Sequence, residues 1–236
     1  MSGEVAGAGA RRPVAEGRDG SDVYRALRDA IASGRFQPNE RLVEADLAER
    51  FLAGRSSIRA ALVRLDQEGL VTLEPHRGGR VRLISEREAI EIEEVRIVLE
   101  RLLARQAALK VTDQDLEALR ETIGEMRRRL AQADPLGYSE LNAKYHQRIW
   151  AIADHQTAAR LLGTLKSQSI RFQYRTILRP GRTARSLEEH EAILEALTAR
   201  DPARSEAAME EHLSEVVETL RWAIDAQQRP PRWLPG

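Results

Sequence analysis

Three histidines in the second half of the chain lie on apolar faces of predicted helices. His146 follows Asn142 by four residues, so both side chains project from one side of a helix. His190 and His212 each fall on the apolar stripe of a later helix. A buried imidazole loses its hydration, and one shared divalent cation would satisfy all three rings. The pattern indicates either a metal site or three hydrogen-bonded core histidines, and the packing of the helices decides between them.

The chemistry of such a metal site follows from its donors. Three neutral imidazoles and one amide oxygen suit zinc, with nickel or manganese as alternatives, and leave room for water or a carboxylate. A metal-dependent hydrolase could use a similar centre. However, Glu189, Glu191 and Glu211, which neighbour the candidate ligands, are interpreted as solvated acids, so no general base is evident. His155 falls at a helix start and is expected at the surface. We therefore expect that the chain is not an enzyme.

A second group of candidate residues lies where two short predicted helices, 44–51 and 55–67, meet at a tight corner. This arrangement is typical of a helix-turn-helix motif, whose second helix enters the major groove of DNA through its N-terminal residues. Arginine can bind guanine through O6 and N7, and serine hydroxyls can bind phosphate. The apolar stripe of the second helix turns Arg55, Ser56 and Arg59 outward. These three are either DNA contacts or ordinary solvated residues.

Two strand-like runs, 70–74 and 80–84, follow this motif and predict a β-hairpin. Its tip carries Arg77, Gly78 and Gly79. Glycine lets a tip approach DNA closely, and arginine suits a narrow minor groove, although an ordinary hairpin turn would also use glycine. The chain has no net charge, but seven arginines face three acids between positions 50 and 82. Such a local basic region favours phosphate contact.

The elements that must position these two groups divide the chain near position 85. Residues 1–19 contain few large apolar side chains and predict a disordered tail. The fold class is therefore mainly α: a winged helix-turn-helix of three helices and a hairpin over 20–84, then an all-helical bundle over 85–228, then a tail over 229–236. The first helix is expected at 21–33 and those of the bundle at 86–109, 113–133, 136–153, 156–178, 184–199 and 202–227.

Composition excludes several other classes of protein. No cysteine is present, so disulfides and thiolate metal sites are excluded, and a reducing cytoplasm is expected. No apolar run is long enough to span a membrane. The N-terminus lacks the apolar segment of a secretory signal.

The first half resembles the winged helix of the GntR family over about residues 21–84. The matching runs are 25–34, 41–48, 55–62 and 65–71. The resemblance implies double-stranded operator DNA as partner, with contacts from Arg55, Ser56, Ser57 and Arg59, and from Arg77 and Gly78 at the wing. Four positions depart from the usual family pattern and bear on which operator sequence is recognised: Ala45, Gly54, Ser57 and Ala60.

The second half resembles the FCD effector domain of the FadR subfamily over about residues 86–225. The matching motifs lie at 94–100, 142–146, 189–193 and 201–213. The resemblance implies a divalent cation held by Asn142, His146, His190 and His212, where asparagine in place of aspartate leaves the site one negative charge poorer. It also implies a small organic acid at or beside the metal. Three arginines are candidates for binding the acid: Arg96, Arg171 and Arg175.

The sequence allows two roles for Arg96: it binds a second carboxylate of the acid in a bidentate contact, or it forms an ion pair with Glu93 or Glu100. For the whole chain, we expect a homodimeric, ligand-responsive regulator, a repressor, that binds a near-palindromic operator. The alternatives are a regulator for which the cation itself is the signal and, less favoured, the hydrolase.

Overall fold

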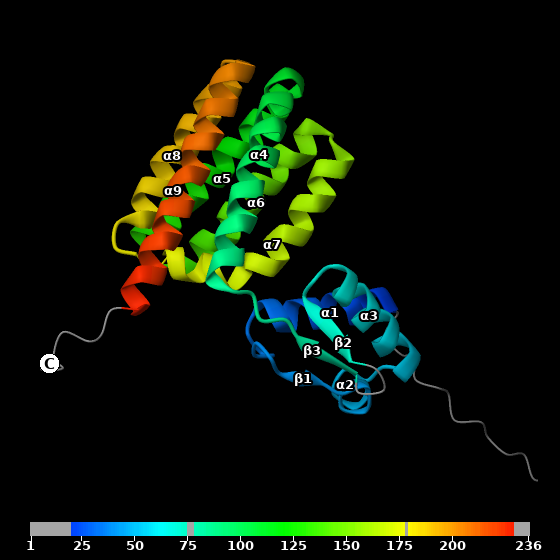
Figure 1. Cartoon of the computed structure of the whole chain (residues 1–236). Coiled ribbons are helices and arrows are strands. Elements are labelled where there is room, and N and C mark those ends of the chain that lie inside the picture. The colour runs from blue at the N-terminus through cyan, green and yellow to red at the C-terminus, as the bar shows by residue number, and fades with distance from the viewer. Residues whose placement is uncertain (1–19, 75–77, 178, 229–236) are drawn as a thin grey trace, which may run out of the picture. The chain divides into compact units, whose positions relative to one another are not determined.

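The computed structural model describes residues 20–74, 78–177 and 179–228 (Figure 1). The two predicted tails, 1–19 and 229–236, lie outside the described residues. Two compact units divide between Arg82 and Leu83. The predicted fold class is confirmed: the chain is mainly helical, with one small sheet near the N-terminus.

The N-terminal unit combines three helices with a three-stranded sheet. The helices are α1 (Gly20–Ala32), α2 (Glu44–Arg50) and α3 (Arg55–Gln67). The strands are β1 (Arg41–Leu42), β2 (Val71–Glu74) and β3 (Gly78–Val81), in the antiparallel order β1-β3-β2. The sequence predicted a hairpin alone, so β1 is an addition to it.

The core of this unit explains the orientation of α3. Ile58, Leu62 and Leu65 are fully buried at helical spacing and pack with Val23 and Leu27 of α1. That packing leaves the opposite face of α3 toward solvent, as predicted. The predicted second wing strand, 80–84, was placed too late. It begins at Gly78, because Gly78 pairs with Glu74 in the β2–β3 ladder.

The C-terminal unit is a bundle of helices α4 to α9. Their bounds are α4 (Glu86–Lys110), α5 (Asp113–Ala131), α6 (Pro135–Ala153), α7 (Gln156–Ile177), α8 (Arg182–Thr198) and α9 (Pro202–Gln228). Figure 1 shows α8 and α9 side by side, and α4 packs along α9 and α6. No helix in the described part of the chain is long and apolar enough to cross a bilayer.

Local capping explains where these helices begin. The side chain of Ser85 accepts a hydrogen bond from the Glu88 amide at the start of α4. Thr112 and Asp115 form a reciprocal capping box at the start of α5. Asp134 accepts from the Gly137 amide at the start of α6. Each cap satisfies a free amide of the first turn and so sets the residue at which its helix begins.

Candidate metal and effector site

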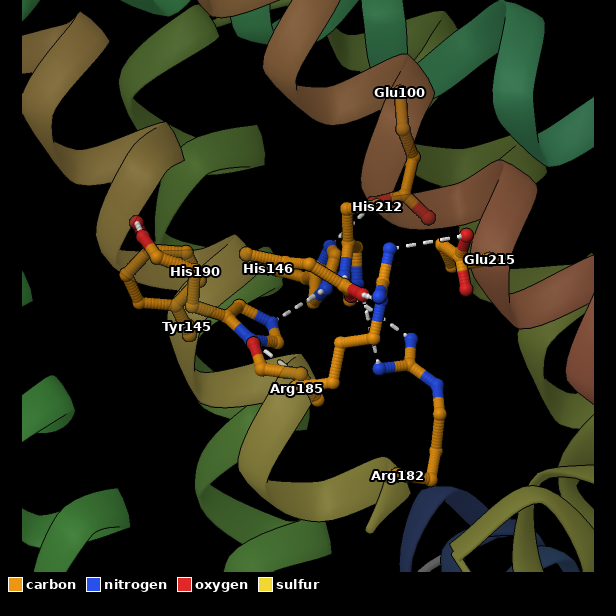
Figure 2. Close-up of polar contacts among 10 residues, drawn as sticks. Glu100, Tyr145, His146, Arg182, Arg185, His190, His212 and Glu215 are labelled. Carbon is orange, nitrogen blue, oxygen red and sulfur yellow. Dashed lines mark hydrogen bonds and ion pairs between the residues drawn. The ribbon is translucent and has the colours of Figure 1, made fainter. Parts of the chain in front are cut away.

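The three predicted histidines converge in the interior of the bundle. His146 on α6, His190 on α8 and His212 on α9 are 1%, 0% and 2% exposed. One ring nitrogen of each lies within 4.8 Å of the others, and His146 Nε2 lies 3.3 Å from His190 Nε2. Figure 2 shows the rings turned toward one another, with Glu100 and Arg182 on opposite sides of them. This packing favours one shared site over three separate core histidines.

The Nδ1 atom of each ring contacts an oxygen outside the cluster. His146 Nδ1 lies 2.6 Å from Glu100 Oε2, and His212 Nδ1 lies 2.7 Å from Glu189 Oε2. His190 Nδ1 contacts the backbone carbonyl of Ser186. Carboxylates and carbonyls accept hydrogen bonds, so each Nδ1 donates and each Nε2 keeps its lone pair. This is the tautomer that a metal ligand requires.

The ionisation of the rings also suits a cation. Burial, together with the neighbouring imidazoles, lowers the pKa of His190 well below its usual value. Burial and His146 do the same for the pKa of His212. Both rings are therefore neutral at pH 7, which is the form that binds a metal.

Asn142 completes the donor set. Its Oδ1 is buried and has no hydrogen-bond partner among the described residues. A buried unsatisfied acceptor costs about 1–3 kcal/mol, and a bound cation would remove that cost. Asn142 lines the same cavity as His146 and His212. The residues present therefore fit a divalent cation held by three nitrogens and one oxygen.

Arg96 lies beside this site but already has two partners. It is buried, and its guanidinium contacts Glu93 Oε2 at 2.6 Å and Glu100 Oε1 at 2.7 Å. Of the two interpretations, the structure therefore shows the ion pair, with both acids. Burial alone would raise the pKa of Glu100, but His146 and Arg96 hold it well below its usual range. Glu100 thus stays charged and orients the ring of His146.

Glu189 was interpreted as a solvated acid, and that interpretation is wrong. Its side chain is 9% exposed and binds Arg182 Nη2 at 2.9 Å as well as His212. Arg182 lies seven residues earlier on α8, so both side chains project from one face of the helix. Sequence reasoning missed Arg182 and the part that Glu100 and Glu189 play. A signal for Glu100 existed, because it shares the buried face of α4 with Arg96 and Leu103.

A cavity of about 60 Å³ opens beside the histidines. Its walls include Arg96, Lys166 and Arg182, together with Asn142. Burial and the nearby Arg96 lower the pKa of Lys166 to about 8, so the ammonium is still mostly protonated at pH 7. The side chains of Arg171 and Arg175, the other predicted effector contacts, lie outside the described residues. The cavity can hold a few water molecules or a small acid.

The predicted DNA contacts lie in the other unit, at the start of α3. Arg55, Ser56 and Arg59 are exposed, and Ser57 is half-buried. Arg59 forms a bidentate pair with Glu44 of α2, through Nε–Oε1 at 2.8 Å and Nη2–Oε2 at 2.6 Å.

The wing residues beside α3 have a structural role of their own. Gly78 has φ +85°, and a Cβ there would overlap the backbone carbonyl of Leu42. The fold therefore requires glycine at this position. Gly78 lines a broad hollow with Arg41, Glu44 and Arg59. Arg77, the other predicted wing contact, lies outside the described residues.

Comparison with known proteins agrees with both halves of this description. Residues 20–81 match the family of bacterial regulatory proteins called the gntR family, and residues 91–215 match the FCD domain. The transcriptional repressor RspR of Escherichia coli is 30% identical over 84% of this chain and 87% of its own length. The repressor GlaR of the same species is 28% identical over 86% of this chain and 96% of its own length. The structure of E. coli McbR/YncC has the same fold, with a TM-score of 0.75. It is 21% identical and covers 87% of this chain and 98% of its own.

A winged helix-turn-helix joined to a helical domain with a buried polar site defines a class of DNA-binding transcriptional regulators. The chain belongs to the GntR family and carries an FCD domain behind its DNA-binding domain. Its relatives are regulators and not enzymes, which confirms that prediction and removes the hydrolase alternative.

Proposed function

We propose that this regulator is a repressor controlled by a small organic acid that binds at a metal site in its C-terminal domain. The observation that carries the proposal is the convergence of His146, His190 and His212 beside the unpartnered Oδ1 of Asn142. When bound, the cation would act as a Lewis acid and hold a carboxylate of the effector. We infer zinc as the cation, with nickel or manganese as alternatives.

The proposed boundaries are 20–84 for the DNA-binding domain and 85–228 for the effector domain. The proposed contacts to operator DNA are Arg55, Ser56, Ser57 and Arg59 at the start of α3, and Arg77 and Gly78 at the wing. Exposure of the arginines on α3 supports this assignment. Two relatives named as repressors support repression as the mode of action. The protein would act on DNA in the cytoplasm.

In the effector domain, the proposed acid lies in the 60 Å³ cavity, against the cationic side chains that line it. Lys166 is the side chain best placed to bind it, because its ammonium faces the ring of Trp150, 5.6 Å from the ring centroid, and forms no ion pair with a described residue. Arg96 lines the cavity but already binds two acids, so we assign it to holding Glu100 in place. Arg171 and Arg175 remain candidates on sequence grounds.

We further propose that the protein acts as a homodimer through α4. Four exposed apolar residues follow the a and d positions of a heptad on this helix, at successive offsets of 3, 4 and 7 positions: Val95, Val98, Leu102 and Leu109. We call them the α4 stripe. A self-complementary apolar stripe favours pairing with the same helix of a second copy. Two copies would present two recognition helices to the two halves of a near-palindromic operator.

A DNA-binding assay tests the proposed function. Fragments from upstream of the protein's own gene are titrated with metal-free and zinc-loaded protein, each with and without a series of small carboxylic acids. We expect a sequence-specific complex that at least one acid weakens, and only when zinc is present. Absence of any sequence-specific complex would contradict the proposal. A complex that responds to zinc alone, and to no acid, would favour the cation as the signal.

A further inference from the structure

The charge of the proposed metal site is balanced before any cation binds. The residues around it include three cationic side chains, Arg96, Lys166 and Arg182. Three carboxylates also belong to this shell, and each is held by an arginine: Glu93 and Glu100 by Arg96, and Glu189 by Arg182. Three positive and three negative charges cancel. Arg185, which also reaches Glu189, pairs with Glu215 and so adds one charge of each sign. The donors that would hold the metal add no charge, because imidazole binds a cation in its neutral form and Asn142 is an amide.

The carboxylates also lie on the far side of the donor residues and do not line the cavity. None of the described residues that line the cavity is acidic, whereas three of them are cationic. Glu100 and Glu189 reach the histidines only through Nδ1, on the side of each ring away from the cluster. A bound divalent cation would therefore bring about two uncompensated positive charges into a buried space. Such charge is costly unless an anion accompanies it.

We propose that the divalent cation and a small carboxylate bind this site cooperatively, because Asn142 and Lys166 leave the charge of the cation uncompensated toward the cavity. This proposal rests on the proposed function above and adds the regulation of its site. The coupling is reciprocal, so the cation raises the affinity for the acid by the same factor by which the acid raises the affinity for the cation. Metal-free protein therefore binds the acid more weakly by that same factor.

Zinc affinity measured in two salts tests the coupling without any DNA. The purified full-length protein competes for zinc with a chromophoric chelator at neutral pH, in sodium acetate and in sodium perchlorate of the same ionic strength. Acetate is the probe because it is small enough for a 60 Å³ cavity. We expect zinc affinity to be at least about tenfold higher in acetate, within the usual range of coupling between two sites. Acetate also binds free zinc weakly, which works against the expected rise.

Two variants assign the coupling to its residues. Asn142→Asp supplies the missing negative charge, so we expect tighter zinc binding in perchlorate and a gain from acetate of less than about threefold. Lys166→Met removes a positive charge, so we expect zinc to bind more tightly in perchlorate and acetate to raise that affinity less than in the wild type. Asn39→Asp is the matched control, because Asn39 lies in the N-terminal unit and should behave as the wild type does.

Each outcome of these titrations is decisive. Equal zinc affinity in both salts would overturn the cooperativity and leave the proposed metal site intact. A wild-type gain from acetate in both Asn142→Asp and Lys166→Met would overturn the assignment to these residues. Absence of zinc binding in either salt would overturn both the cooperativity and the metal site on which it rests.

Discussion

Among the three histidines, His190 is the one whose removal disturbs the neighbouring residues least. Its Nδ1 contacts Ser186 alone, whereas loss of His146 or His212 would deprive Glu100 or Glu189 of a partner in a buried place. We expect His190→Ala to lose metal uptake, because the ring would supply one of the three nitrogen donors of the proposed site. Elemental analysis of the purified variant measures this, and basal DNA binding should persist.

His155→Ala is the matched control for that experiment. His155 lies outside the cluster, where its Nδ1 accepts a hydrogen bond from the Ala158 amide at the start of α7. We expect the variant to keep its metal and to lose only a little helix stability, about 1 kcal/mol. A full complement of metal in His190→Ala, equal to that of His155→Ala, would refute the assignment of His190 as a ligand.

The pair between Glu44 and Arg59 is the corresponding detail of the DNA-binding unit. Hydrogen bonding by Arg59 lowers the pKa of Glu44, so the acid stays charged and offsets the charge of the arginine. We expect Glu44→Gln to free Arg59 for phosphates. Affinity for unrelated DNA should then rise several-fold, and the ratio of operator affinity to unrelated affinity should fall. Fluorescence anisotropy with operator and scrambled duplexes measures both quantities.

Glu49→Gln provides the control, because Glu49 is an exposed acid of the same helix. It makes the same change in net charge without touching Arg59. If both variants bound unrelated DNA equally tightly, net charge alone would explain the effect and the Glu44–Arg59 pair would have no role in specificity.

At the scale of elements, strand β1 and Gly78 depend on each other. The strand is two residues long and is held by pairing with β3, where Leu42 lies opposite Gly79. A side chain at Gly78 would meet the carbonyl of Leu42 and would also be strained at a positive φ. We expect Gly78→Ala to destabilise the sheet by about 1–3 kcal/mol. Faster hydrogen exchange of the amides of β3, followed by mass spectrometry, would show this.

Gly54→Ala separates this effect from the loss of a glycine in general. Gly54 has φ −69°, and a Cβ there would lie 3.7 Å from Ser56 Oγ, an ordinary van der Waals contact, so alanine fits without strain. Its hydrogen exchange in β3 should match that of the wild type. Unchanged exchange in Gly78→Ala would contradict the requirement for glycine at the wing.

The helices could be predicted from the sequence because their signals are local. Periodic apolar residues and caps such as Ser85 lie within a few residues of the boundaries that they set. Strand β1 could not, since two residues carry no periodicity and the pairing with β3 that forms it is remote in sequence. A wing strand that begins at Gly78 was also missed, because glycine is read as a turn signal.

The candidate site likewise has features that the sequence predicted and features that it did not. The inward faces of His146, His190 and His212 follow from helical periodicity, which is why their burial was predictable. The partners of their Nδ1 atoms were not, because Glu100 lies on a different helix from His146, and Glu189 on a different helix from His212. Only the packing of the helices brings these side chains together.

At the scale of the whole molecule, the α4 stripe links the sequence to the proposed dimer. Val95, Val98 and Leu109 are 49%, 66% and 64% exposed, whereas another face of the same helix is buried in the core. Exposed apolar residues in a row, interrupted here only by Arg105 between Leu102 and Leu109, favour an interface. The neighbouring Arg101 and Arg105 already pair with acids of α9, so the stripe is bordered by neutralised charge. A second copy can approach it without strong repulsion.

Val98→Glu should therefore separate the proposed dimer. In a pair of facing α4 helices the new carboxylate would lie in the apolar seam, where it has no partner and meets its own copy. Leu136→Glu is the control, because Leu136 is 60% exposed on α6 and lies outside the stripe. Sedimentation velocity should find a monomer for Val98→Glu and a dimer for Leu136→Glu. Operator affinity should fall at least about tenfold in the monomer, because one recognition helix then contacts one half-site alone. A dimeric Val98→Glu protein would show that α4 is not the interface, while monomeric wild-type protein would contradict the dimer itself.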